Sequence, residues 1–287
     1  MLQLATKTHP LKIREFVFLF CHITLISCSA FLAVEKNQDI YFTIFIYALI
    51  YLSISVHEFG HSFFGFIGGD WAVRSNGYLT LNFLKYAHPV LTFIVPAILF
   101  FTAGFAVSGA AVYIREQYIK SGLMRFLTHA GGVIGNALMI IALIGLKPLI
   151  LNYLPSENLN SSIDFVIYIN ALMIAYNLIP IPPLDGFNIL LSPLPNDLFK
   201  QHLLKICTPL GFFLLIYFYA SPSAQQIPIV SLWLPFFKDN LFPLFQIYPP
   251  ENGFELAKID LERLNEIRVV SGDAVIAIEN IIQSFVK

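Results

Sequence analysis

Long apolar runs divide this chain into segments of membrane-spanning character. A helix that crosses a bilayer needs about 20 apolar residues, and five runs approach or exceed that length: 16–34, 40–67, 126–146, 163–179 and 206–220. Two further runs, 90–111 and 227–247, are interrupted by proline, glycine or charged residues, so neither must be a straight span. The pattern predicts an all-α polytopic membrane protein with about five to six transmembrane helices.

Two stretches break this pattern. Residues 69–89, "GDWAVRSNGYLTLNFLKYAHP", are rich in Gly, Asn and Thr, which predicts a short β-like or re-entrant segment at the membrane edge. Residues 250–287 place apolar residues at helical spacing among mixed charges, as in a small amphipathic, soluble tail. We therefore expect a membrane-embedded domain over 1–249 and a C-terminal tail over 250–287.

Composition agrees with a membrane protein and narrows the function classes. Hydrophobic residues make up 57% of the 287 residues and charged residues 12%, whereas soluble domains are about a quarter charged. A net charge of -1 gives no reason to expect nucleic acid as a partner. The three cysteines lie in apolar segments without a C-x-x-C pair, so we interpret them as packing residues.

The distribution of basic residues predicts the orientation. Lys7, Lys12 and Arg14 precede the first apolar run, and the loop after it, "VEKNQDI", carries two acids and one lysine. The N-terminus is therefore expected on the cytoplasmic side, as a first anchor rather than a cleaved signal peptide. The second run then ends towards the cytoplasm.

That second run carries the motif "HEFGH". His57 and His61 are four residues apart, so on a helix both imidazoles can face a single ion, and Glu58 lies about 100° around the axis, within reach of a water on that ion. Zinc held by three protein groups keeps a fourth place for water. The alternative is a structural cluster of buried polar residues, but ionisable groups cost about 2.5–3.5 kcal/mol inside a membrane helix, which favours a functional site.

A third ligand is expected from the stretch "NLIPIPPLDG". Pro180, Pro182 and Pro183 must break the helix before Asp185, because proline removes backbone donors. Irregular backbone at membrane depth is tolerated only where protein buries it or water reaches it. Asp185 is thus the best candidate ligand, although the prolines could also end a helix at the interface, with Asp185 and Gly186 in an ordinary turn.

These motifs together resemble the site-2 protease family, the intramembrane zinc metalloproteases. The stretch 69–89 is similar to the segment that follows the HExxH helix in the compact branch lacking a PDZ domain. The resemblance covers about residues 50–190. It implies an HExxH helix over about 40–67 and an LDG helix over about 163–186.

The resemblance also implies roles for individual residues. His57, His61 and Asp185 would be the ligands of one catalytic Zn²⁺, Glu58 the catalytic base, and Asn177 a support for substrate or the developing oxyanion.

Other matches to the family concern packing. Gly132 and Asn136 match its G-x-x-x-N helix, and we interpret them as helix-packing residues near the site. Residues 109–118 lack a family proline and Val133 replaces another, which affects how substrate is held rather than the metal chemistry.

The implied function is hydrolysis of a peptide bond within the transmembrane segment of a membrane-protein substrate, in a bacterial inner membrane with the active site towards the cytoplasm. The expected partners are that substrate and the lipid bilayer, and a homo-oligomer is left open. A transporter or ion-handling protein lined by the same polar residues is the main alternative, and the absence of paired half-repeats argues against it. A catalytically inactive relative that binds partners is a third class, which the intact Glu58 disfavours.

A shared ion constrains the topology. If the two motif-bearing helices run in the same direction, and the run 126–146 returns the chain to the outside, then residues 90–111 must enter and leave on the cytoplasmic side. We predict that Tyr118→Cys, in a background without the native cysteines, reacts with a membrane-impermeant thiol reagent only from the cytoplasmic face. Labelling from the outer face would contradict this topology.

Overall fold

The computed structural model describes residues 13–85, 112–194, 198–220, 236–241, 243 and 247. Every element in these ranges is helical. The longer helices are α1 (Ile13–Lys36), α2 (Asp39–Gly68), α5 (Gly122–Tyr153), α6 (Glu157–Asn177) and α8 (Leu198–Ala220). The short elements are α3 (Ala72–Ser75), α7 (Asp185–Leu191), the 3₁₀ turns η1 (Phe83–Lys85) and η3 (Glu116–Tyr118), and the π-helical turn η5 (Phe237–Leu241).

Four of these helices are long and apolar enough to cross a membrane: α1, α2, α5 and α6. They correspond to the first four predicted runs. The fifth run, 206–220, lies in α8, which is not among these four. The run 90–111, most of 227–247 and the tail 250–287 fall outside the described residues, so the expected total of five to six spans stays a prediction.

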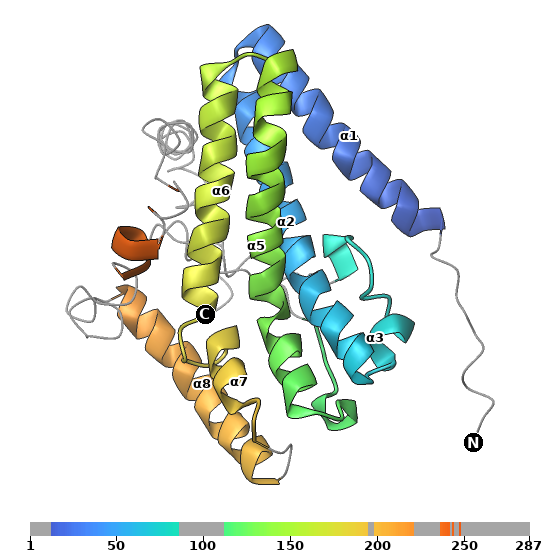
Figure 1. Ribbon diagram of the computed structural model, residues 1–287, viewed down its shortest axis with the longest axis vertical. Coiled ribbons are helices and arrows are strands. Elements are labelled where there is room, and N and C mark those ends of the chain that lie inside the picture. The colour runs from blue at the N-terminus through green and yellow to red at the C-terminus, as the bar shows by residue number, and fades with distance from the viewer. Residues whose placement is uncertain are drawn as a thin grey trace, which may run out of the picture.

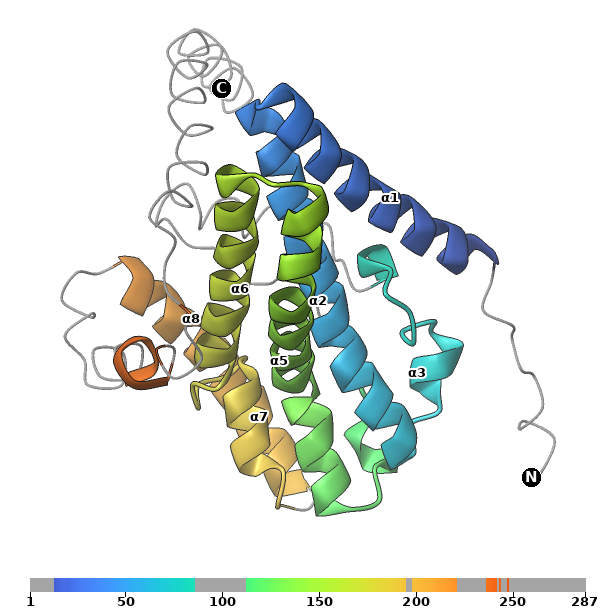
Figure 2. The same cartoon turned by 45° about the horizontal axis from the view of Figure 1, so that its top comes forward.

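Helices α2, α5 and α6 lie side by side, and α1 leans away from the bundle (Figure 1). The α1–α2 and α5–α6 connections are at one end of the bundle, and α7 and α8 are at the other (Figures 1 and 2). Helices α2 and α6 therefore run in the same direction, as a shared metal site requires. Large apolar side chains fill the space between the helices, among them Phe42, Phe45, Leu159, Ile163 and Val166.

Local sequence sets the ends of the bundle helices. Ser121 and Ser156 accept backbone N–H groups of the first turns of α5 and α6, as N-cap serines do. Helix α2 ends at Gly69, whose φ of 121° suits glycine. The chain returns to the same end of α2, because the Lys120 N–H donates to the Gly68 carbonyl over 3.4 Å.

The β-like character predicted for 69–89 is wrong for the part that the structure describes, and the re-entrant alternative stays a prediction. Residues 69–85 contain α3, η1 and turns, and no strand. Local hydrogen bonds explain the difference: Asp70 accepts the Ala72 N–H, Asn82 accepts the Leu84 N–H, and both bonds close tight turns rather than a ladder.

The helix expected over 163–186 is in fact two helices. Helix α6 ends at Asn177, and Asp185 is the first residue of α7. The three prolines between them cannot donate to a helix, so the predicted break before Asp185 is confirmed. The break turns Asp185 towards α2.

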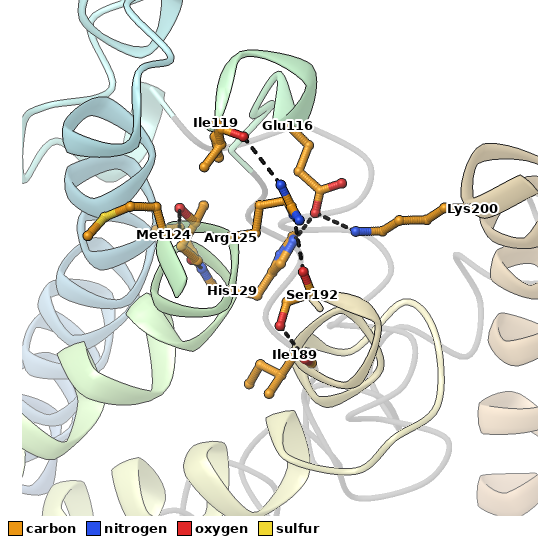
Figure 3. A network of polar contacts seen from close by, with 10 residues as sticks. Glu116, Ile119, Met124, Arg125, His129, Ile189, Ser192 and Lys200 are labelled. Carbon is orange, nitrogen blue, oxygen red and sulfur yellow. Dashed lines mark hydrogen bonds and ion pairs between the residues drawn. The ribbon is translucent and has the colours of Figure 1, made fainter. Parts of the chain in front are cut away.

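A polar junction joins η3, α5, α7 and α8 beside the bundle (Figure 3). Glu116 Oε1 accepts from His129 Nε2 at 2.6 Å and from Lys200 Nζ at 2.8 Å, and only 1% of Lys200 is exposed. Arg125 donates to the carbonyls of Ser192 and Ile119. Burial by itself would raise the pKa of Glu116, but His129 and Lys200 outweigh it and lower the pKa to about 2.

Replacing Glu116 should therefore destabilise the protein. Glu116→Gln leaves the buried Lys200 ammonium without its carboxylate partner. We expect this loss to lower the free energy of unfolding by about 3–5 kcal/mol at neutral pH. Because the folded-state pKa is lowered, this stabilisation is present above pH 4.5 and is lost as the pH falls towards 2. Thermal unfolding in detergent should show a lower Tm for Glu116→Gln than for the wild type at pH 7. The difference in Tm between the two should narrow on acidification. The exposed Glu35→Gln should leave the Tm unchanged. An unchanged Tm at pH 7 would contradict the assignment.

Candidate metal centre

Three side chains from two distant parts of the chain converge at one point. His57 and His61 lie on one face of α2, and Asp185 enters from the start of α7. The two histidine Nε2 atoms are 3.2 Å apart, and Asp185 Oδ2 is 3.4 Å from His57 Nε2 and 3.3 Å from His61 Nε2. These are the three ligands that the sequence predicted, and the structure brings them together as a group able to hold a metal ion.

The spacing of these three atoms fits a tetrahedral ion. Zinc binds histidine nitrogen and carboxylate oxygen at about 2.0–2.2 Å, and bonds of that length hold neighbouring ligand atoms about 3.3–3.5 Å apart. The three distances of 3.2–3.4 Å match one face of such a tetrahedron. The fourth corner is left for water or substrate.

The hydrogen bonds of the histidines support the same conclusion. His61 Nδ1 lies 2.7 Å from the Thr128 carbonyl, which can only accept, so Nδ1 carries a proton and Nε2 is the nitrogen that can bind an ion. His57 Nδ1 likewise lies 2.6 Å from Asn136 Oδ1, an amide oxygen that can only accept. Asp185 Oδ2 is buried and has no hydrogen-bond partner among the described residues. Two imidazole nitrogens and a carboxylate oxygen that face one another this closely need a shared proton or cation, and their number and spacing fit a metal ion.

Glu58 lies in the same buried region without joining the three-atom cluster. Its side chain is 4% exposed, and its Oε2 accepts the Val112 N–H at 3.1 Å. Val112 is the first described residue of a segment without regular secondary structure that leads into η3. A buried carboxylate next to a metal site, but outside its ligand set, is suited to accept a proton from water.

Glycines of α5 make room for the ligands. A Cβ atom on Gly132 would collide with the imidazoles of His57 and His61. A Cβ atom on Gly131 would collide with the backbone of Gly60 in α2. Gly132, which the sequence suggested as a packing residue, therefore also shapes the space of the candidate site.

Other residues differ in how the sequence signalled them. Asn177 is the last residue of α6, and none of the hydrogen bonds among the described residues joins its side chain to the cluster, so its predicted role stays a prediction. Asn136, which the sequence indicated as a packing residue, also accepts a hydrogen bond from His57 Nδ1 through its Oδ1 atom. Sequence reasoning missed the Thr128 carbonyl, which contacts His61. It also missed Asn170, which accepts a hydrogen bond from Asn136, and Ser53, which accepts one from Asn170. Ser53 had a usable signal, because it continues the four-residue spacing of the histidines along α2.

Comparison with curated proteins finds relatives of one kind. Over 176 residues the chain is 30% identical to "Putative zinc metalloprotease Rip2" of Mycolicibacterium smegmatis, covering 61% of this chain and 66% of that protein. Identity to the Rip2 of Mycobacterium tuberculosis is 31% over 136 residues, covering 47% and 52%. With "Putative zinc metalloprotease YwhC" of Bacillus subtilis it is 27% over 210 residues, covering 69% and 90%. No protein-family model matches the chain, and no solved structure matches it significantly.

The relatives and the site point to the same class, the membrane metalloproteases with an HExxH helix. The curated homologues of this chain are members of the site-2 protease family, the family that its motifs resemble. The matched region spans about half to two thirds of the length of the Rip2 proteins. Four apolar helices and these relatives together make it an integral membrane protein.

The space left by Gly132 gives a specific prediction. Gly132→Ala should place a methyl group against both imidazoles and weaken zinc binding about tenfold or more, measured by competition with a chromophoric chelator. Gly145→Ala is the matched control, because it makes the same change in the same helix with no atom within 4 Å of the new methyl. Equal zinc affinity in the two variants would contradict the proposed geometry.

Proposed function

We propose that this protein is an intramembrane zinc metalloendopeptidase that hydrolyses a peptide bond within the transmembrane segment of a membrane-protein substrate. The observation that carries the proposal is the meeting of His57 Nε2, His61 Nε2 and Asp185 Oδ2 at tetrahedral spacing, with the Glu58 carboxylate buried nearby. The arrangement does not suit a transporter, because a transported ion must be released and two fixed imidazoles with a carboxylate hold zinc tightly.

His57, His61 and Asp185 would hold the ion, and the hydrogen bonds at Nδ1 would keep both imidazoles turned towards it. Bound zinc supplies Lewis acidity towards water and towards the scissile carbonyl. Glu58 takes the proton of the attacking water on its carboxylate and later passes a proton to the leaving amine. The Val112 N–H holds the Glu58 carboxylate in place before substrate arrives.

The substrate must present its backbone in an open form. A transmembrane helix hides its amides in internal hydrogen bonds, so local unwinding has to precede cleavage. Asn177, at the end of α6 before the break that delivers Asp185, is placed in this proposal as a donor to the substrate carbonyl or the developing oxyanion. The site would face the cytoplasmic side of a bacterial inner membrane.

Replacing Glu58 separates catalysis from metal binding. We expect Glu58→Gln to retain one zinc per chain and to lose about 10²- to 10⁴-fold in the cleavage rate of a transmembrane peptide in detergent or liposomes. The control is Glu35→Gln, which makes the same change at an exposed position at the end of α1. Full cleavage by Glu58→Gln would exclude Glu58 as the base, and a wild-type protein without zinc would exclude the proposed function.

A further inference from the structure

A chain of polar side chains leads away from His57 into the middle of the bundle. His57 Nδ1 lies 2.6 Å from Asn136 Oδ1, and Asn136 Nδ2 donates to Asn170 Oδ1 at 2.9 Å. Asn170 Nδ2 donates to the Val166 carbonyl at 2.8 Å and to Ser53 Oγ at 2.9 Å. The three side chains that follow His57, those of Asn136, Asn170 and Ser53, are all fully buried.

One backbone carbonyl fixes the direction of every bond in this chain. A carbonyl only accepts, so the Asn170 group that faces Val166 must be the amide nitrogen. Asn170 Oδ1 then faces Asn136 and can only accept, which turns the Asn136 nitrogen towards it. Asn136 Oδ1 is left facing His57, so it accepts from Nδ1 and keeps the proton there.

The consequence reaches the atom that would bind metal. A neutral imidazole with its one proton on Nδ1 has a bare Nε2, and a bare Nε2 is what a metal ion needs. If Asn136 were free to rotate by half a turn, its amide nitrogen would face Nδ1 and would favour the opposite tautomer. In that tautomer the proton would stand on Nε2, where the ion has to bind.

We propose that Asn170 is a positioning residue that sets the tautomer of His57 through Asn136 and so prepares its Nε2 for the metal. The metal part of this inference rests on the proposed function, whereas the tautomer part concerns the metal-free protein. His61 is an internal control, because its tautomer is set by the Thr128 carbonyl in α5 and involves neither asparagine.

The test compares the ¹⁵N chemical shifts of the imidazoles with zinc affinity. The purified full chain, labelled with ¹⁵N-histidine and stripped of metal, is measured over a series of rising pH until the ¹⁵N shifts show that both imidazoles are neutral. The seven histidines are assigned by single His→Gln variants. In the wild type we expect both His57 and His61 to carry the proton on Nδ1.

Asn170→Leu removes the stronger of the two acceptors of the Asn136 amide nitrogen and leaves only the weak acceptor Met173 Sδ at 3.8 Å. We expect the His57 signals to move towards the Nε2-protonated form and zinc affinity to fall about 10- to 100-fold, while His61 Nδ1 stays protonated against the Thr128 carbonyl. The His61 Nε2 signal is not part of this control, because that atom lies 3.2 Å from His57 Nε2. Ser53→Ala should leave the His57 tautomer unchanged, because the Val166 carbonyl still orients Asn170. Asn170→Leu combined with Asn136→Asp should restore it, because a carboxylate has acceptors only and needs no orientation.

The outcomes separate this inference from the proposed function. An Nδ1-protonated His57 in Asn170→Leu would overturn the role of Asn170. Loss of the proton from His61 Nδ1 in the same variant, or no recovery in the double variant, would overturn it as well. A wild-type protein that binds no zinc would overturn the proposed function, and the tautomer of His57 in the metal-free protein would still be measured.

Discussion

Helices α2 and α5 touch backbone to backbone where Gly60 meets Gly131, and the candidate metal centre depends on this contact. Side chains of ordinary size would hold the helices farther apart. At the observed distance, the carbonyl of Thr128 reaches His61 and the side chain of Asn136 reaches His57. The close approach of α2 and α5 therefore orients both histidines, and no contact with α7 is needed for this.

The apolar pattern and the local motifs predicted much of this arrangement. Helix α2 extends one residue beyond the predicted 40–67 at each end, and the proline-rich break before Asp185 lies where the sequence placed it. Both features depend on residues close together in the chain, such as the prolines that cannot continue α6. The prediction that Asp185 lies next to the two histidines needed one further condition, namely that all three residues bind the same ion.

What could not be predicted depends on contacts between distant segments or on competing local bonds. The polar stretch after α2 looked β-like by composition, yet Asp70 and Asn82 accept nearby backbone N–H groups and close turns instead. Asn170 looks like an isolated polar residue in an apolar helix, and its partners in α2 and α5 follow only from how the helices pack. Such interhelical bonds each add only about 0.6 kcal/mol on average, so their main effect is to fix orientation.

The break between α6 and α7 has a consequence for the protein's lifetime. Because α2 supplies two of the candidate ligands and α7 the third, a bound ion would cross-link segments that lie more than 100 residues apart in the chain. An ion that binds only the folded state adds about 2.7 kcal/mol at a free concentration one hundred times its Kd. Metal supply would then govern how long the folded protein persists as well as its chemistry, and starvation for metal would expose the chain to degradation.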